Sequence, residues 1–283
     1  MATGIPGVVA DSSAEGLKAQ LAEVWDSLIA LGSELTDEEW TAATPCPGWS
    51  VGAQYAHMIG TESMLLGRGR PDVDPGRPDH VRNDIGGANE VWVAALRRES
   101  RPEVLARFAE TTGARRQALA AMGEDDFDAP SWTPVGQADY RRFMQVRVFD
   151  CWVHEQDIRD AIGRPGHEDG PAAEQSVDEL ARAIGYLVGK KAGAPDGSSM
   201  SVELTGPVHR SIHAQVVDGR ARGMDTLDLP ATATVRLSST AFARLACGRV
   251  DPGRVLGGAL GGVQLAGDAD LGERFVRNLA YTI

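Results

Sequence analysis

The 283-residue chain is poor in basic residues and in cysteine. Lys and Arg number 28 against 40 Asp and Glu, which gives a formal net charge of -12. An acidic surface repels a phosphate backbone, so nucleic-acid binding is not expected. The three cysteines, Cys46, Cys151 and Cys247, form no CxxC pair and predict no disulfide framework, which fits a reducing, cytoplasmic setting.

Signals for secretion, membrane insertion and several common catalytic mechanisms are also missing. Residues 1–13 have no basic region followed by a long apolar run, so no signal peptide is expected. No uninterrupted apolar stretch of about 18 residues occurs, and no membrane partner is predicted. We find no G-x-S-x-G, no Walker A motif and no G-x-G-x-x-G after a strand, so the mechanisms tied to those motifs are not indicated.

The first half of the chain has the periodicity of amphipathic helices. Apolar residues from Leu17 to Leu28 recur at helical spacing and predict a helix over 13–31. Thr36 with Glu39 predicts a capping box for a short helix. Other main helices are expected over 51–68, after Ser100, and over 138–162, with a shorter helix over 83–98 and a loop at 122–136. Four main helices joined by long loops predict a four-helix bundle.

The pattern changes after the Gly- and Pro-rich segment 163–171, which we interpret as a linker. A helix is expected over 172–190 and another over 240–249. Alternating or β-branched residues predict strands at 201–206, 211–219 and 231–238, and a strand, a turn and a helix within 263–279. The expected fold is therefore mixed: a bundle over 1–165, followed by a small α+β domain over 166–283.

The octapeptide DCWVHEQD, residues 150–157, holds the first candidate for chemistry. Asp150 and His154 lie four residues apart, so both project from one face of a helix, where they can chelate one divalent ion. The same spacing is common on solvated helix faces, where it forms only a weak ion pair. Glu155 and Gln156 are expected to form a solvated face of that helix.

Among the other histidines, His57 is the one in an apolar helix interior, QYAHMIG. A histidine there is either a hydrogen-bonded core residue or a ligand. If a bundle brings it to Asp150 and His154, the three form a two-histidine, one-carboxylate set with an open position, as in catalytic zinc sites. His80 and His167 lie in loops and are expected to be solvated.

These stretches resemble a known family. GWSVGAQYAH has Trp49 eight residues before His57, and DCWVHEQDIRDA has a carboxylate four residues before His154 and Asp157 three residues after it. Both resemble the mycothiol-dependent maleylpyruvate isomerase family, within the wider DinB-like group of metal-binding four-helix bundles. VRLSSTAFARLACGRVDP and VQLAGDADL are similar to the small domain, akin to sterol carrier protein 2, that follows the bundle in that family. The resemblance covers nearly the whole chain.

The resemblance implies a site and a cosubstrate. It assigns Zn2+, or another divalent metal, to His57, Asp150 and His154, and it points to Arg249 as a catalytic arginine. Mycothiol would be the thiol cosubstrate, and its metal-bound thiolate would add to an electrophilic double bond. The implied reaction is cis–trans isomerisation of maleylpyruvate or a similar unsaturated acid. One position departs from the pattern, because the better-known isomerase has Glu where this chain has Asp150.

Two other functions are compatible with the same residues. A mycothiol S-transferase, in detoxification or biosynthesis, would release a stable thiol adduct. A non-enzymatic carrier would bind a small apolar molecule in its second domain. For either enzyme the partners are a small electrophilic substrate and a low-molecular-weight thiol, and the chain is expected to be a monomer or a homodimer. Asp157 is expected to orient His154 from outside the ligand set, and none of the cysteines is expected to be a nucleophile.

Overall fold

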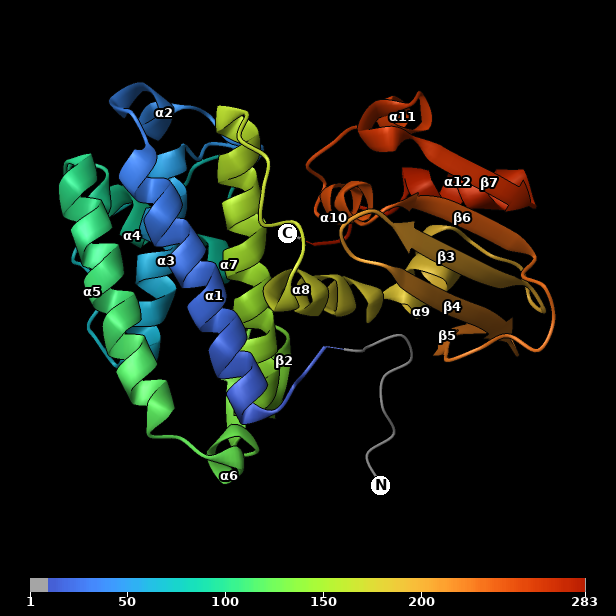
Figure 1. Ribbon diagram of the computed structural model, residues 1–283, viewed down its shortest axis with the longest axis horizontal. Helices are drawn as coiled ribbons and strands as arrows, with labels where there is room; N and C mark the ends of the chain where they lie inside the picture. The colour runs from blue at the N-terminus through green and yellow to red at the C-terminus, as the bar shows by residue number, and fades with distance from the viewer. Residues whose placement is uncertain (1–9, 283) are drawn as a thin grey trace. The chain divides into compact units, whose positions relative to one another are not determined.

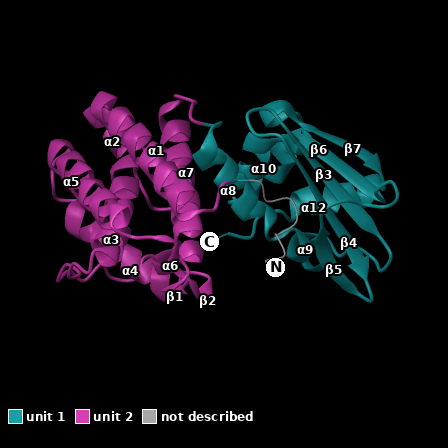
Figure 2. Ribbon diagram, turned by 60° about the horizontal axis from the view of Figure 1, so that its bottom comes forward, with its two compact units in different colours: residues 1–10, 168–283 teal, residues 11–167 magenta. Residues whose placement is uncertain are grey.

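The computed structural model describes residues 10–282. The chain divides into a helical unit, Asp11–His167, and a sheet unit made of Ala10 and 168–282 (Figure 2). A helical N-terminal region followed by a sheet-containing domain confirms the predicted fold class. Within residues 10–282, no helix is both long enough and apolar enough to cross a membrane.

Four long helices make up the bundle of the helical unit (Figure 1). They are α1 (Ala14–Glu34), α3 (Val51–Leu65), α5 (Arg101–Ala120) and α7 (Tyr140–Ile162). α1 packs against α5 and α7, whereas α3 packs against α5, α7 and the shorter α4 (Asp84–Leu96). Two small helices, α2 (Asp37–Thr41) and α6 (Glu124–Phe127), lie in the connections. The contact between α3 and α7 positions the site described below.

Local sequence signals set the ends of these helices. The Ser50 hydroxyl accepts a hydrogen bond from Ala53 N and starts α3. Thr36 and Glu39 form the predicted capping box of α2. Gly163 ends α7 with φ 65, a left-handed conformation that an L side chain adopts only at a cost.

Aromatic side chains fill the centre of the bundle. Trp25, Tyr55 and Phe108 are fully buried, and the Tyr55 and Phe108 rings meet edge to face with centroids 5.2 Å apart. The Tyr55 hydroxyl donates to Leu28 O at 2.8 Å, so the buried phenol is satisfied. This core holds α1, α3 and α5 at a fixed spacing.

The segment 122–136 is not the loop that its Gly, Pro and Asp content predicts. It contains α6 and the strand β1 (Pro130–Thr133), which pairs with β2 (Gly136–Asp139) as an antiparallel hairpin. Gly136 has φ 108, a value that permits the tight connection. Because these strands are only four residues long, they show too little alternation to be recognised from the sequence.

The sheet unit is built on five strands in the order β5-β4-β3-β6-β7. The strands are β3 (Ser199–Thr205), β4 (Arg210–Val217), β5 (Arg220–Met224), β6 (Ala233–Ser238) and β7 (Val263–Gly267). β3 and β6 are parallel, and the other neighbours are antiparallel. The helical segments of the unit are α8 (Pro171–Ala181), α9 (Ile184–Tyr186), the π-helix η1 (Leu187–Lys191), α10 (Ser239–Ala246), α11 (Pro252–Leu256), the 3-10 helix η2 (Ala259–Gly261) and α12 (Ala269–Arg277).

One face of this sheet is buried and the other is polar. Val202 pairs in register with Ile212 on β4 and with Val235 on β6, and all three are buried. On the opposite face, Arg236 donates to Glu203 at 3.2 Å. Helices α9, α10 and α12 pack against the strands, as expected for an antiparallel-rich sheet with a single covered face.

The prediction of one continuous helix over 172–190 is wrong. α8 ends at Ala181 and is followed by the three-residue α9 and the π-helix η1. The packing on β5 explains the break: a Cβ on Gly185 would lie 2.9 Å from Ala221 O, and one on Gly189 would lie 2.8 Å from Ala221 Cβ. These glycines permit a close approach to the strand and weaken a regular helix at the same time.

Candidate metal centre

Helices α3 and α7 bring together the three ligands predicted from the sequence. His57 Nε2 lies 3.0 Å from Asp150 Oδ2, and His154 Nε2 lies 3.5 Å from Asp150 Oδ1. The two imidazole centroids are 4.8 Å apart. One ligand atom from each residue lies within 4.8 Å of the other two. The set therefore converges on one point, although His57 lies 93 residues before Asp150.

Burial and neighbouring charges shift the pKa of each of the three predicted ligands. Burial lowers the pKa of His57 despite the adjacent carboxylate, so its imidazole is neutral at pH 7 and offers a lone pair. Burial alone would raise the pKa of Asp150, but the two imidazoles and the Arg147 guanidinium hold that pKa well below its ordinary value. Burial alone would lower the pKa of His154, but Asp150 and Asp157 raise it well above 6.5, so without an ion this imidazole carries a proton that a bound metal would displace.

The donor set suits zinc. Two imidazole nitrogens and one carboxylate are the ligands of catalytic zinc sites, which keep a fourth position open. The histidines are nearly buried, whereas 27% of the Asp150 side chain is exposed. Access therefore exists on the side of the carboxylate. The residues present fit a divalent ion, and their role as ligands remains a prediction.

A buried network of charged side chains, which the sequence did not predict, holds the Asp150 carboxylate in place. Arg147 donates to Asp150 Oδ2 through Nη1, and to Glu62 Oε1 through Nε and Nη2 at 3.0 and 2.8 Å. Arg115 Nε donates to the other Glu62 oxygen at 2.9 Å. Glu62 is 1% exposed and the two arginines are 2% exposed. Arg147 stands three residues before Asp150 on the same helix face. That spacing is the one feature of the sequence that could have indicated the contact between Arg147 and Asp150.

Trp49 forms an aromatic wall beside both imidazoles. Its ring centroid lies 5.1 Å from that of His57 and 5.7 Å from that of His154. Its Nε1 donates to Glu90 Oε1 at 2.5 Å, and His80 Nε2 lies 2.7 Å from the same oxygen. His80 was expected to be solvated. Instead it is half-buried and tied to a buried carboxylate, because the loop that precedes α4 folds back onto that helix.

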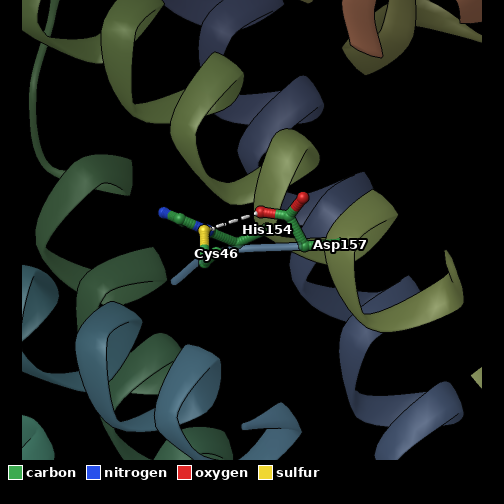
Figure 3. A group of neighbouring side chains, drawn as sticks. All are labelled: Cys46, His154 and Asp157. Atoms are coloured by element: carbon green, nitrogen blue, oxygen red, sulfur yellow. Dashed lines mark hydrogen bonds and ion pairs between the residues drawn. The ribbon is translucent and has the colours of Figure 1, made fainter. Parts of the chain in front are cut away.

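Behind His154 lie Asp157 and Cys46. Asp157 Oδ2 is 3.3 Å from His154 Nδ1 and accepts a hydrogen bond from Cys46 Sγ at 3.1 Å. Figure 3 shows the thiol and the carboxylate meeting beside the imidazole ring. Asp157 therefore stands where a carboxylate that orients His154 is expected.

The expectation that Glu155 and Gln156 face solvent is wrong. Glu155 is 0% exposed and Gln156 is 3% exposed. The Glu155 carboxylate accepts from Ser27 and Arg159 and lies 2.6 Å from His167 Nδ1. His167, also expected to be solvated, has a side chain only 12% exposed, with Nε2 3.1 Å from Glu23. Packing of α1 on α7 buries this second face, a contact that a single helix pattern does not show.

The remaining candidates are Arg249 and the cysteines. Arg249 follows α10 in the sheet unit, is half-buried, and donates from Nη1 to Cys247 O at 2.9 Å. Its catalytic role remains a prediction. Burial raises the pKa of the Cys151 thiol to about 12, so this thiol is protonated at neutral pH and is a poor nucleophile.

The fold defines a class: a four-helix bundle, with a candidate metal centre between α3 and α7, followed by an α+β domain. The family model for the mycothiol maleylpyruvate isomerase N-terminal domain matches residues 21–159, and that for the C-terminal domain of the same family matches residues 174–274. The chain belongs to the mycothiol-dependent maleylpyruvate isomerase family.

Individual relatives are distant. Two uncharacterized proteins of Mycobacterium tuberculosis, one from each of two strains, are 25% identical over 200 residues, covering 64% of this chain and 70% of each relative. The crystal structure of the mycothiol-dependent maleylpyruvate isomerase is similar with a TM-score of 0.55 and 16% identity, covering 89% of this chain and 92% of that one. A histidine-to-alanine mutant of that isomerase gives a TM-score of 0.54 at 17% identity. These likenesses establish a shared fold.

Proposed function

We propose that this chain is a metal- and mycothiol-dependent enzyme that isomerises maleylpyruvate or a similar unsaturated acid about its double bond. The observation that carries the proposal is the convergence of His57, Asp150 and His154 between α3 and α7. Membership in the family and a fold shared with the mycothiol-dependent maleylpyruvate isomerase support it. A thiol cosubstrate must stay reduced, so we expect a cytoplasmic enzyme.

In this proposal His57, Asp150 and His154 hold a zinc ion, or another divalent ion. Such an ion would supply the positive charge that keeps a thiol deprotonated at neutral pH. Asp157 orients His154 from the Nδ1 side, and Arg147 orients the Asp150 carboxylate. Trp49 shields both imidazoles from water on one side. These contacts hold the ligands in place before substrate arrives.

The substrate chemistry is addition followed by elimination. When a thiolate adds to a cis carbon–carbon double bond, a carbon–sulfur bond forms and the double bond becomes single, with the negative charge passing to the conjugated carbonyl. Rotation about the single bond and loss of the thiolate then give the trans acid, with no net change in atoms or electrons. For Arg249 we propose binding of a substrate carboxylate or of the enolate charge, since a guanidinium matches both.

Metal binding is tested with His57→Ala, and His209→Ala in the sheet unit serves as the control. The purified chain is expected to retain close to one zinc per chain, measured by elemental analysis after dialysis. His57→Ala is expected to lose most of it and His209→Ala to keep it. If the wild-type chain holds no metal, and His57→Ala changes neither metal content nor activity, the proposal fails and a non-enzymatic carrier becomes the better hypothesis.

The reaction is tested by incubation with mycothiol and maleylpyruvate, followed by mass spectrometry. An isomerase yields a product of unchanged mass and regenerates the thiol. An S-transferase yields a stable adduct whose mass is the sum of the two reactants, and that result would replace the proposed reaction with this alternative. Arg249→Lys is expected to keep part of the activity and Arg249→Met to lose it, with metal content unchanged in both.

A further inference from the structure

The indole of Trp49 is in contact with both of the predicted histidine ligands. Its ring centroid lies 5.1 Å from that of His57 and 5.7 Å from that of His154. Rings this close pack in preferred orientations, so the plane of the indole restricts the planes of both imidazoles. The contacts that hold Trp49 therefore act on the geometry of the candidate metal centre.

The two imidazoles differ in what orients them through Nδ1, the nitrogen that does not face Asp150. His154 Nδ1 faces Asp157 Oδ2 at 3.3 Å. His57 Nδ1 is buried, and within residues 10–282 it has no hydrogen-bond partner. A metal-bound histidine usually donates from its second ring nitrogen to a carboxylate or a carbonyl, and that bond fixes the ring. His57 lacks the bond, so its orientation depends on packing, to which the indole of Trp49 contributes.

Glu90 on α4 holds this indole in place. Trp49 Nε1 donates to Glu90 Oε1 at 2.5 Å, and the Glu90 side chain is only 3% exposed, so little water competes for the bond. His80 Nε2 lies 2.7 Å from the same oxygen. The His80 ring also lies against the backbone just before Trp49, because a Cβ on Gly48 would be 2.5 Å from His80 Nδ1. Glu90 thus ties the indole and the loop before α4 together at one atom.

We propose that Glu90 is a positioning residue of the metal centre, which acts through the Trp49 indole on the orientation of His57. The inference rests on the proposed role of His57, Asp150 and His154 as ligands. Glu90 is not a ligand in this proposal, so its removal changes the affinity for the ion and the geometry of coordination. Loss of a contact that orients a metal ligand typically lowers metal affinity by about 10- to 100-fold.

The test measures Co2+ binding to the full chain, without substrate or mycothiol. Co2+ bound by imidazoles and a carboxylate absorbs visible light, and the position and strength of this absorption depend on ligand geometry. We expect Glu90→Ala to lower Co2+ affinity by about 10-fold or more and to change the spectrum even at saturating Co2+. Glu90→Gln keeps an oxygen that can accept from the indole, so it should retain most of the affinity. Asp178→Ala is the matched control, since Asp178 is a fully buried carboxylate of the sheet unit, and it should change neither quantity.

Trp49→Phe tests whether Glu90 acts through the indole. It keeps an aromatic ring and removes the N–H that donates to Glu90. We expect Trp49→Phe to weaken Co2+ binding as well, and the double variant to bind no more weakly than the more affected single variant, because both substitutions remove the same bond. Circular dichroism establishes that each variant is folded. If Glu90→Ala does not fold, the affinity of Trp49→Phe decides the question.

The inference is overturned if folded Glu90→Ala or folded Trp49→Phe keeps the affinity and the spectrum of the wild-type chain. It is also overturned if the losses of affinity in the two single variants multiply in the double variant. A wild-type chain that binds no Co2+ would overturn the proposed metal centre together with this inference. Tight binding in the wild-type chain that Glu90→Ala leaves unchanged would overturn this inference alone.

Discussion

The buried charge network around Glu62 predicts an unusually large effect for the single change Glu62→Gln. The Glu62 carboxylate accepts three hydrogen bonds from Arg115 and Arg147, and all three side chains are at most 2% exposed. Glutamine keeps the shape and removes the charge. Two guanidinium groups then remain buried around a neutral partner, and removing one member of a buried ion pair costs about 3–5 kcal/mol.

Glu110→Gln is the matched control. Glu110 also accepts two bonds from a guanidinium, that of Arg68, at 2.8 and 2.6 Å, but its side chain is 57% exposed. Solvent screening limits exposed pairs of this kind to about 0–1 kcal/mol. The two substitutions are therefore chemically identical and differ in burial.

Urea unfolding gives the free energy of unfolding of both variants and thermal melts give their Tm, each followed by circular dichroism in the chain stripped of metal. For a domain of this size, about 3–5 kcal/mol corresponds to a fall in Tm of roughly 6–20 °C. No metal is added, because an ion bound at the proposed ligand Asp150 could change the contact between Asp150 and Arg147 and so mask the effect. If Glu62→Gln and Glu110→Gln destabilise the helical unit equally, within about 1 kcal/mol, the reasoning from burial is refuted.

Further predictions concern pH, helix ends and metal. Burial alone would lower the pKa of His167, but the Glu155 and Glu23 carboxylates raise it above 6.5. The stability that His167 contributes is therefore complete below pH 6.5 and is lost as the pH rises through the folded-state pKa. His167→Gln should flatten the pH dependence of the urea midpoint in that window. Gly163→Ala should destabilise the chain by about 1–2 kcal/mol because φ is positive there. Gly113→Ala, inside α5 with open space around it, should stabilise the chain by about 0.5–1 kcal/mol. Equal changes in Tm for the two variants would contradict both predictions. Zinc at 100 times its Kd should stabilise the chain by about 2.7 kcal/mol, and the stabilisation should disappear in His57→Ala.

Much of the helical architecture was predictable because its signals are local. The Thr36 capping box, the Ser50 N-cap and the Gly163 C-cap each depend on residues within one turn. The pairing of Asp150 with His154 on one helix face is local as well. In the sheet unit, alternating or β-branched residues predicted β3, β4 and β6 and the strand β7. The short strand β5 and the helix α11 had too few residues to show a pattern.

What the sequence determined by itself was therefore the class of fold and the side chains able to bind a metal, since periodicity, caps and residue chemistry act over a few positions. Tertiary structure alone decided which of those side chains meet. It brought His57 to Asp150 across 93 residues and Cys46 to Asp157 across 111. It also buried Glu155, which the sequence pattern of α7 alone places on a solvent-exposed face. The physical reason is that burial and charge pairing depend on which helices pack together, and that packing is set by the whole core rather than by any one segment.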